Sequence, residues 1–303
     1  MDLAKSSGIK TRKSGFQKHQ QNMAYVFILL PMTLFLIFIV IPSVMSLYLS
    51  FTNYNVIQTP KFVGIKNYST LLKDQFFWLS LKNTFYYTAL YVPLGIMTAL
   101  SAALLLNRKK FGIGLFRVSF YLPVLSSAVA TATIWIWLLN PQYGIINTVL
   151  GWFGINGPAW LADTTWAMIS IVVMSVWASF GSNMMIFLAG LQGIPDYLYE
   201  SAKLDGANRW QLFWYITLPS LRSTTFFITT MLFIGAFQMF DQAFVMTQGG
   251  PGNTTLTLVY YIYNNGFGSL RMGYASALSF VLFLIILTIS LINMKFNSEN
   301  VQF

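Results

Sequence analysis

Six long apolar runs, separated by polar loops, dominate the pattern of hydrophobic and polar positions along the chain. Each run meets the roughly 20-residue length that a helix needs to cross about 30 Å of hydrocarbon. The runs are Tyr25–Leu47, Asn83–Leu106, Val118–Leu139, Thr164–Leu188, Ser223–Val245 and Met272–Met294. They are too long and too uniformly apolar for barrel strands, and lipid offers no partners to backbone N–H and C=O groups. The pattern therefore predicts an all-α, polytopic membrane protein with six transmembrane helices.

Two kinds of residue interrupt this pattern. Pro31, Pro93 and Pro123 lie inside runs, and each is expected to bend or interrupt its helix, because proline has no N–H for the helical ladder. Asp241, in the fifth run, is the only charged residue in any of the six runs.

Composition agrees with a membrane protein and excludes several kinds of catalytic and metal site. Hydrophobic residues make up 56% of the 303 residues and charged residues only 9%, whereas a soluble domain carries about 25% charged residues. The chain has no cysteine and a single histidine, His19. This removes thiol catalysis, disulfides and most transition-metal sites, so the sequence predicts neither an enzyme nor a metal or cofactor site on this chain.

The basic residues indicate which way the chain crosses the membrane. If the N-terminus is cytoplasmic, 13 of the 18 basic residues lie on the cytoplasmic side and 5 outside, as the positive-inside rule requires. Both termini are then expected in the cytoplasm. The predicted parts are a basic cytoplasmic arm (1–23), a transmembrane domain (24–294) that includes a cytoplasmic loop (191–219), and a cytoplasmic tail (295–303).

The arm itself leaves alternatives open. Its five basic residues face a single acid, which is compatible with binding nucleic acid or anionic lipid, but a solvated arm held at the cytoplasmic leaflet is the simpler interpretation. A signal peptide also begins with basic residues. However, the apolar run that follows is longer than the usual 7–15 residues and no A-x-A cleavage site closes it, so we expect a retained anchor.

The cytoplasmic loop has the pattern of a helix, a sharp turn and a second helix. Pro195 and Asp196 suit the first turn of a helix that continues to residue 204. Gly206 then permits a turn, because glycine adopts positive φ at little cost. A second helix from about residue 208 to 216 is expected to stop before Pro219. The alternative is a simple amphipathic connector.

The sequence of this loop resembles a known family motif. Glu-Ser-Ala-Lys-Leu-Asp-Gly-Ala at residues 200–207, followed by Phe213, Ile216 and Leu218-Pro219, resembles the EAA loop of binding-protein-dependent ABC importer permeases. Further stretches resemble the carbohydrate-uptake branch, and specifically the first permease of maltose and glycerol-3-phosphate importers. These stretches are residues 51–52, 62–68, 83–84, 249–255 and 272–277. Ser201 and Ser223 depart from the motif but keep both positions small.

The resemblance implies the type I ABC importer permease fold, in which this loop is a cytoplasmic coupling helix that docks on an ATPase subunit. The implied coupling residues are Glu200, Ser201, Ala202, Asp205, Gly206, Ala207, Leu218 and Pro219. The chain has no G-x-x-x-x-G-K-[ST] phosphate loop, so ATP and Mg²⁺ are expected on a separate ATPase chain. The other implied partners are a second homologous permease, an extracytoplasmic solute-binding protein and a carbohydrate, and the implied location is a bacterial cell membrane.

Polar residues on otherwise apolar helices are the candidates for the substrate pathway. They are Ser179, Ser182 and Asn183 in the fourth run and Gln238 and Asp241 in the fifth. A carboxylate in a spanning segment is usually functional, and both stretches match positions where the family contacts its sugar. The alternative for Asp241 is a helix-end hydrogen bond to the Gly249-Gly250 turn.

Two further groups complete the candidate sites. Trp177, Phe180, Phe237 and Phe240 are near enough to stack on a sugar, although aromatic residues at helical spacing more often serve packing. Gly249, Gly250 and Pro251 form a turn, and together with the first external loop they are where the resemblance implies that the binding protein docks.

Other functional classes remain as alternatives. A secondary transporter usually has inverted repeats and a coupling-ion site, and neither is visible in the sequence. A channel subunit for a small polar solute is harder to separate by composition alone. Dependence of uptake on ATP and on a binding protein would distinguish an ABC permease from both.

Overall fold

The computed structural model of the chain describes residues 15–108 and 111–298, almost entirely as helix. The longer helices are α1 (Gly15–Phe35), α2 (Ile41–Ser50), α4 (Gln75–Leu106), α6 (Ala128–Leu138), α8 (Trp166–Gln192), α12 (Arg222–Phe237) and α14 (Met272–Ser298). The shorter helices are α3 (Lys66–Lys73), α5 (Ile113–Tyr121), α7 (Ile145–Trp152), α9 (Asp196–Leu204), α10 (Arg209–Leu212), α11 (Leu218–Ser220) and α13 (Leu258–Tyr263).

Irregular helical turns and one strand pair connect these helices. The π-helical turns are η1 (Leu36–Val40), η3 (Phe213–Thr217), η4 (Ala243–Thr247) and η5 (Asn264–Gly268), and η2 (Leu122–Leu125) is a 3₁₀ turn. The strands β1 (Thr52–Asn53) and β2 (Lys61–Phe62) pair antiparallel, with Thr52 opposite Phe62.

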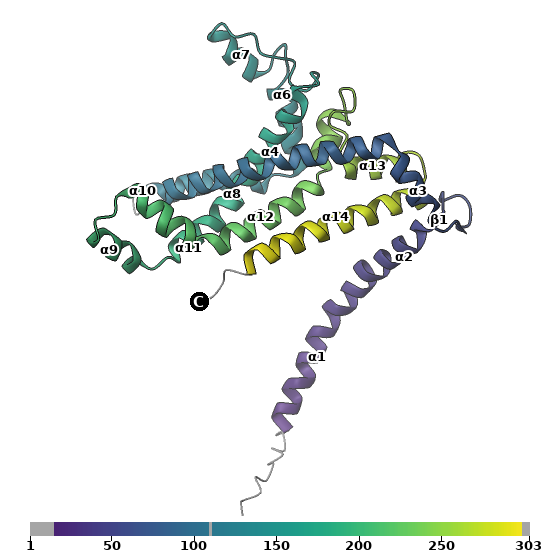
Figure 1. Cartoon of the computed structure of the whole chain (residues 1–303), viewed down its shortest axis with the longest axis horizontal. Helices are drawn as coiled ribbons and strands as arrows, with labels where there is room; N and C mark the ends of the chain where they lie inside the picture. Colours follow the sequence, from purple (N-terminus) through teal and green to yellow (C-terminus); the bar gives the residue numbers. More distant parts are fainter. Residues whose placement is uncertain (1–14, 109–110, 299–303) are drawn as a thin grey trace, which may run out of the picture.

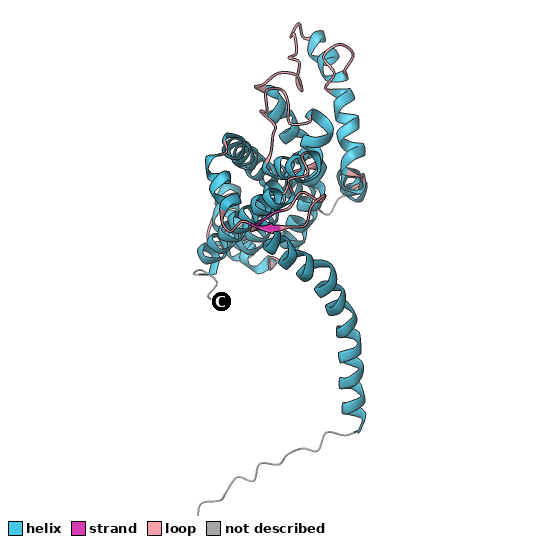
Figure 2. Cartoon of the chain, turned by 90° about the vertical axis from the view of Figure 1, so that its right-hand side faces the viewer, coloured by secondary structure: helices cyan, strands magenta, loops and turns pink. Residues whose placement is uncertain are grey.

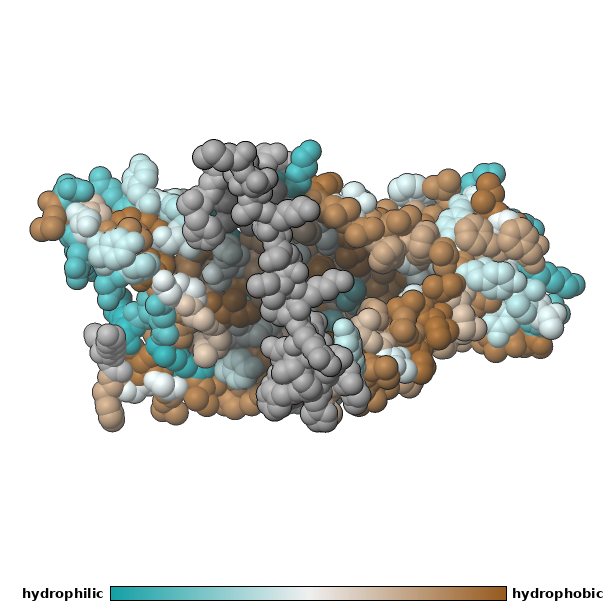
Figure 3. All heavy atoms as spheres, turned by 90° about the horizontal axis from the view of Figure 1, so that it is seen from below, coloured by the Kyte–Doolittle hydropathy of each residue, from teal (hydrophilic) through white to brown (hydrophobic). Residues whose placement is uncertain are grey.

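The membrane-spanning pattern agrees with six crossings. Within the described ranges, four segments are long and apolar enough to span as single helices, namely Phe27–Ser50, Gln75–Leu106, Trp166–Gln192 and Met272–Lys295. Two bent helix pairs raise the number to six if each pair is one span. On the face shown in Figure 3, polar side chains gather at both ends and apolar side chains cover much of the visible surface between them, as expected for a protein surrounded by lipid.

The third predicted run is not one continuous helix. The chain bends by 100° between Ile113–Leu125 and Ala128–Leu138. Pro123 lies in the 3₁₀ turn η2, Ser126 is extended, and the Ser127 hydroxyl then caps the new helix by accepting a hydrogen bond from the Ala130 N–H (3.2 Å). The interruption expected at this proline is confirmed, whereas Pro31 and Pro93 lie inside α1 and α4 without interrupting either helix.

The helix formed by the fifth predicted run is shorter than expected. α12 ends at Phe237, and the non-helical residues 239–240 separate it from a new short helix that begins at Asp241. Asp241 is therefore outside the spanning helix, because the chain leaves the helical path before reaching it. The second and sixth helices, in contrast, are longer than their apolar runs.

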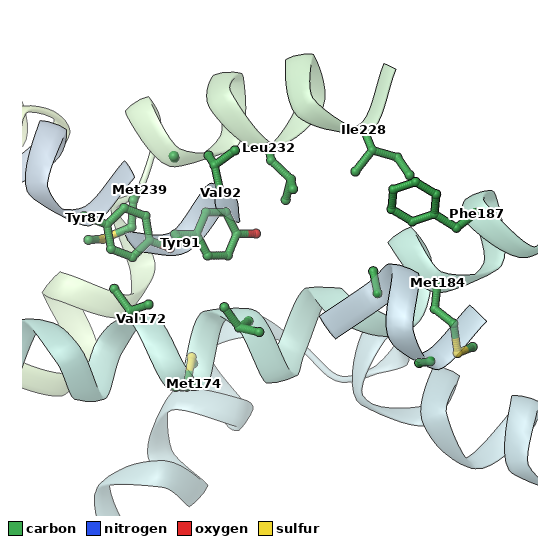
Figure 4. Packing of buried hydrophobic residues seen from close by; sticks show 14 of the residues in the cluster. Tyr87, Tyr91, Val92, Val172, Met174, Met184, Phe187, Ile228, Leu232 and Met239 are labelled. Carbon is green, nitrogen blue, oxygen red and sulfur yellow. The ribbon is translucent and has the colours of Figure 1, made fainter. Parts of the chain in front are cut away.

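The core lies between α4, α8 and α12. Tyr87, Tyr91 and Val92 from α4 meet Val172, Met174, Met184 and Phe187 from α8, with Ile228 and Leu232 from α12 (Figure 4). These helices run side by side along the length of the molecule (Figure 1). Their uniformly apolar sequences are explained by burial on one side and lipid on the other.

Two parts stand away from this bundle. α1 leaves the body at α2 and none of its described side chains from Phe27 to Phe35 is buried (Figure 2). The α6–α7 segment projects from the opposite side of the bundle (Figure 1). The first 14 residues of the predicted basic arm, and residues 299–303 of the predicted tail, lie outside the described ranges.

A second apolar cluster closes the end of the bundle that holds β1, α3 and α13. Leu71, Phe77, Phe237, Leu258 and Leu278 are its most buried members. It joins the start of α4 to α13 and α14, and so gives the connecting segments at this end a defined position.

Candidate functional site

The predicted helix–turn–helix is present between α8 and α12. Pro195 is extended (φ −63°, ψ 133°) and α9 begins directly after it, with Asp196 in the first turn and Lys203 in the last. These charges complement the helix dipole at both ends. The predicted first helix is therefore confirmed to within one residue.

The turn is built around Gly206 and a cap at Asn208. Gly206 has φ +82°, and the Ala207 N–H donates to the Ala202 carbonyl (2.9 Å) across the turn. The Asn208 Oδ1 accepts from the Gln211 N–H (2.9 Å), while the Asn208 N–H donates to the Gln211 side chain (2.8 Å). This capping box starts α10 and makes the turn a defined structure.

The second helix of the loop continues further than predicted. It was expected to stop before Pro219, but α10, η3 and α11 follow one another to Ser220. In the π-helical turn the Leu218 N–H donates to the Phe213 carbonyl, and Pro219 then lies in the first turn of α11, where a missing N–H is tolerated. The chain bends by 64° only between Ser220 and Arg222.

The loop is attached to the bundle on one face and exposed on the other. The Tyr199 and Thr217 hydroxyls are hydrogen-bonded (3.0 Å), and Leu198 packs with Tyr199 against the core. Glu200 is exposed and Leu204 has 89% of its surface accessible. An exposed leucine at the tip of an ordered loop indicates a surface available to a partner.

The predicted coupling residues line a shallow hollow on this exposed surface. Its volume is about 250 Å³, and its wall includes Ala202, Asp205, Gly206 and Ala207 with Gln211 and Tyr215. Small side chains around Gly206 leave room for another backbone to approach. The structure thus brings four of the predicted residues together, while Pro219 lies at the far end of the second helix and lines a different cavity.

The candidate pathway residues of α8 form one hydrogen-bonded group. The Asn183 amide donates to the Ser179 carbonyl (3.2 Å), and the Ser182 hydroxyl donates to the same oxygen (2.8 Å). Tyr91 of α4 donates its hydroxyl proton to the Ser179 hydroxyl (2.9 Å). Tyr91 was not among the predicted residues, because nothing in a uniformly apolar run indicates which tyrosine faces a neighbouring serine.

The second candidate group lies at the break after α12. Gln238 is the exposed residue that follows the end of α12, and Asp241 is exposed at the first position after the break. Within the described ranges Asp241 makes no hydrogen bond to Gly249 or Gly250, so the helix-end alternative is wrong. No hydrogen bond links either residue to the Ser179 group.

The four aromatic candidates differ in environment. Phe237 is 1% exposed and packs edge-on against Phe85, so it belongs to the core. Phe240 is stacked on Phe244 with ring centroids 5.2 Å apart. Tyr263 contacts both of these rings and was not among the predicted residues. Trp177 and Phe180 each pair with an aromatic residue of the broken third span, namely Trp135 and Phe120.

The Gly249–Thr255 turn is held rigidly against α4. The Asn83 amide donates to the carbonyls of Asn253 (2.8 Å) and Leu256 (3.0 Å). The Thr84 hydroxyl accepts from the Leu258 N–H (3.0 Å), and the Thr255 hydroxyl donates to the Gly250 carbonyl (2.7 Å). The turn is therefore a fixed surface at the same end of the molecule as β1 and α3.

A carboxylate at the start of α4 joins three helices. Asp74 caps α4 by accepting from the Phe76 N–H (2.9 Å), and its other oxygen accepts hydrogen bonds from the hydroxyls of Tyr261 and Tyr274. Burial alone raises the pKa of Asp74, but the hydrogen bonds from the two tyrosines and the backbone outweigh it and lower the pKa below 3.8. We refer to Asp74, Tyr261 and Tyr274 as the carboxylate latch.

Replacing Asp74 by asparagine is expected to destabilise this end of the protein by about 1–3 kcal/mol, because charge-assisted bonds to both tyrosines are lost while asparagine still caps α4. Since the folded-state pKa is lowered, the latch contributes fully above pH 3.8 and its contribution disappears as the pH falls through the folded-state value. Thermal unfolding in detergent from pH 7 to pH 3 measures both effects. Equal melting temperatures for Asp74→Asn and the parent at pH 7 would contradict the latch.

Comparisons with known proteins agree with this architecture. A model of the family described as the binding-protein-dependent transport system inner membrane component matches residues 91–297. The probable ABC transporter permease protein YesP of Bacillus subtilis (strain 168) is 39% identical, over 98% of this chain and 97% of that protein. The arabinooligosaccharides transport system permease protein AraP of Halalkalibacterium halodurans is 37% identical, over 93% of this chain and 91% of that protein.

A solved structure shares the fold. It is a crystal structure of a bacterial alginate ABC transporter in complex with an alginate pentasaccharide-bound periplasmic protein. The matching chain has a TM-score of 0.80 and 23% identity, over 92% of this chain and 95% of that chain. The likeness confirms the predicted type I ABC importer permease fold. The chain belongs to the family of binding-protein-dependent transport system inner membrane components, and it is a permease subunit of an ABC transporter.

Proposed function

We propose that this permease forms, with a second homologous permease, the translocation path of an ATP-driven importer for an oligosaccharide or related carbohydrate. The observation that carries the proposal is the ordered, exposed loop from α9 to α10, whose turn residues line an open hollow. The relative named for arabinooligosaccharides and the alginate transporter of similar fold support a carbohydrate as the substrate class.

The loop couples ATP hydrolysis to the membrane helices. A cytoplasmic ATPase dimer, which binds ATP and Mg²⁺, receives the turn around Gly206, and Glu200 and Asp205 pair with its basic groups. The capping box and the Tyr199–Thr217 hydrogen bond make the loop stiff. Movement of the ATPase is then transmitted to α8 and α12, the two helices that the loop connects.

The ends of the molecule have different partners. The end with α9 faces the cytoplasm together with both termini, and the chain crosses the cell membrane of a bacterium. The opposite end receives an extracytoplasmic binding protein on the rigid turn at Gly249, Gly250 and Pro251. The first external loop, which includes β1, β2 and α3, contributes to the same surface.

The substrate path passes the polar groups of α8 and the break after α12. Hydroxyl, amide and carboxylate groups beside aromatic rings suit the hydroxyl-rich edges and apolar faces of a sugar.

Asp241→Asn is expected to raise the KM for the sugar about tenfold, because a charged acceptor becomes neutral. It is expected to leave the rate of binding-protein-stimulated ATP hydrolysis within about twofold of the parent rate. Uptake and ATPase assays on the same proteoliposomes measure this. An unchanged KM would remove Asp241 from the path.

The function is tested by reconstitution. The permease pair, the ATPase and the binding protein are placed in liposomes, and accumulation of radiolabelled arabino-oligosaccharide or maltodextrin is followed with ATP inside. Uptake is expected only when ATP and the binding protein are both present. Uptake that persists without ATP would favour the channel or secondary-transporter alternatives, and ATP-driven uptake of a non-carbohydrate alone would overturn the substrate class.

A further inference from the structure

A cavity of about 530 Å³ opens between the start of α12 and the last turns of α14. It lies at the same end of the molecule as the α9 loop, directly after the 64° bend that joins the loop to α12. Its wall has a polar part, which includes Arg222, Thr225 and Asn293, and an apolar part, which includes Leu218 and Phe226. Leu218 and Pro219, two of the coupling residues that the resemblance implies, line this cavity, but the coupling proposed above uses the turn around Gly206 and not the cavity.

The polar part contains donors without acceptors. Arg222 is exposed and has no hydrogen-bond or ion-pair partner among the described residues. The Thr225 hydroxyl also lacks a partner, and it is shielded from water, so a ligand in the cavity reaches it only when the side chain turns toward the cavity. Leaving a buried donor unsatisfied costs about 1–3 kcal/mol, so a ligand with anionic oxygens would be favoured here. The Asn293 amide donates to the Thr230 hydroxyl (2.7 Å), which fixes its orientation at the cavity wall.

The apolar part indicates what carries those oxygens. Phe226 and Leu218 line the same cavity as Arg222, and the apolar spans of α12 and α14 begin or end beside it. A free anion would gain nothing from this apolar wall. A ligand with an anionic head and a hydrocarbon tail would satisfy both parts, and basic residues at the ends of spanning helices attract anionic lipid.

We propose that this cavity binds an anionic phospholipid, with its phosphate at Arg222 and Thr225 and an acyl chain along Phe226. The lipid would fill the space between α12 and α14 next to the bend at Leu221. It would thereby brace the joint through which the α9 loop is connected to the spanning helices. The proposal depends on the cavity and its side chains and not on which solute is carried.

Thermal unfolding of the assembled, delipidated transporter tests the proposal. Phosphatidylglycerol is expected to raise the melting temperature, and phosphatidylcholine or inorganic phosphate at the same concentration is not. Arg222→Gln should require about tenfold more phosphatidylglycerol for half of the shift, because a charge-assisted bond is lost. Lys82→Gln, which removes one positive charge from an exposed position of α4 outside the cavity, should behave as the parent.

A second variant separates ligand binding from folding. Thr225→Val removes a hydroxyl that has no partner, so the melting temperature without lipid should not fall, while the response to phosphatidylglycerol should weaken. Equal shifts with phosphatidylcholine would overturn the proposal, as would a full shift with inorganic phosphate. Loss of the ATPase subunit from purified Arg222→Gln transporter, with an unchanged lipid response, would instead identify the cavity as a subunit contact.

Discussion

Replacing Gly206 by valine is expected to abolish ATP-driven uptake while the transporter still assembles in the membrane. Apart from its immediate chain neighbours, no described residue has an atom within 4 Å of a Cβ built at Gly206, so the new side chain would extend into the hollow that the ATPase subunit is proposed to enter. Blocking the centre of an interface costs about 2 kcal/mol or more, which weakens binding about thirtyfold. Uptake into proteoliposomes and co-purification of the ATPase measure the loss.

The matched control is Gly112→Val. Gly112 has nearly the same backbone conformation (φ +85°, against +82° for Gly206) and the same open surroundings, but it lies before α5. A β-branched side chain at positive φ costs about 1–2 kcal/mol at either position. Both variants should therefore lose similar stability, and only Gly206→Val should lose coupling. Normal uptake by a membrane-inserted Gly206→Val transporter would exclude the α9–α10 turn as the coupling element.

Replacing Gly181 by alanine is expected to be the most destabilising methyl addition in α8. A Cβ at Gly181 would lie 2.2 Å from the Phe120 carbonyl oxygen and 3.0 Å from the Tyr121 Cα. Both are backbone atoms of α5, and they cannot move without shifting that helix. Overpacking of this kind costs about 1–3 kcal/mol, or more where backbone must move. The melting temperature and the yield of monodisperse protein in detergent should both fall clearly.

Gly235→Ala provides the comparison within another spanning helix. Gly235 lies in α12, and beyond the backbone of its own helix and its two chain neighbours no described residue has an atom within 4 Å of its built Cβ. The same methyl group should therefore change stability by no more than about 1 kcal/mol, and in the stabilising direction, since alanine favours helix. If Gly181→Ala and Gly235→Ala melted at the same temperature, the close contact between α8 and α5 would not be a determinant of the fold.

The coupling loop shows which structural features local sequence can predict and which it cannot. The beginning and end of α9 and the turn at Gly206 were predicted correctly, because a proline, an acidic first turn and a glycine act on their own backbone. The end of the second helix was predicted wrongly at Pro219, because the π-helical turn before it provides a different hydrogen-bond register. The roles of the loop, pathway and docking residues remain predictions that the experiments above test.

The sequence by itself determined that this protein lies in a membrane, that its fold is helical and which family it belongs to. The reason is that the length of the apolar runs, the low share of charged residues and the loop motif are properties of contiguous residues. Only the tertiary structure decided where helices break and which polar groups meet. Asp74 contacts tyrosines 187 and 200 residues away, and Gly181 is constrained by α5. Such contacts follow from the packing of helices against one another, which a uniformly apolar run does not encode.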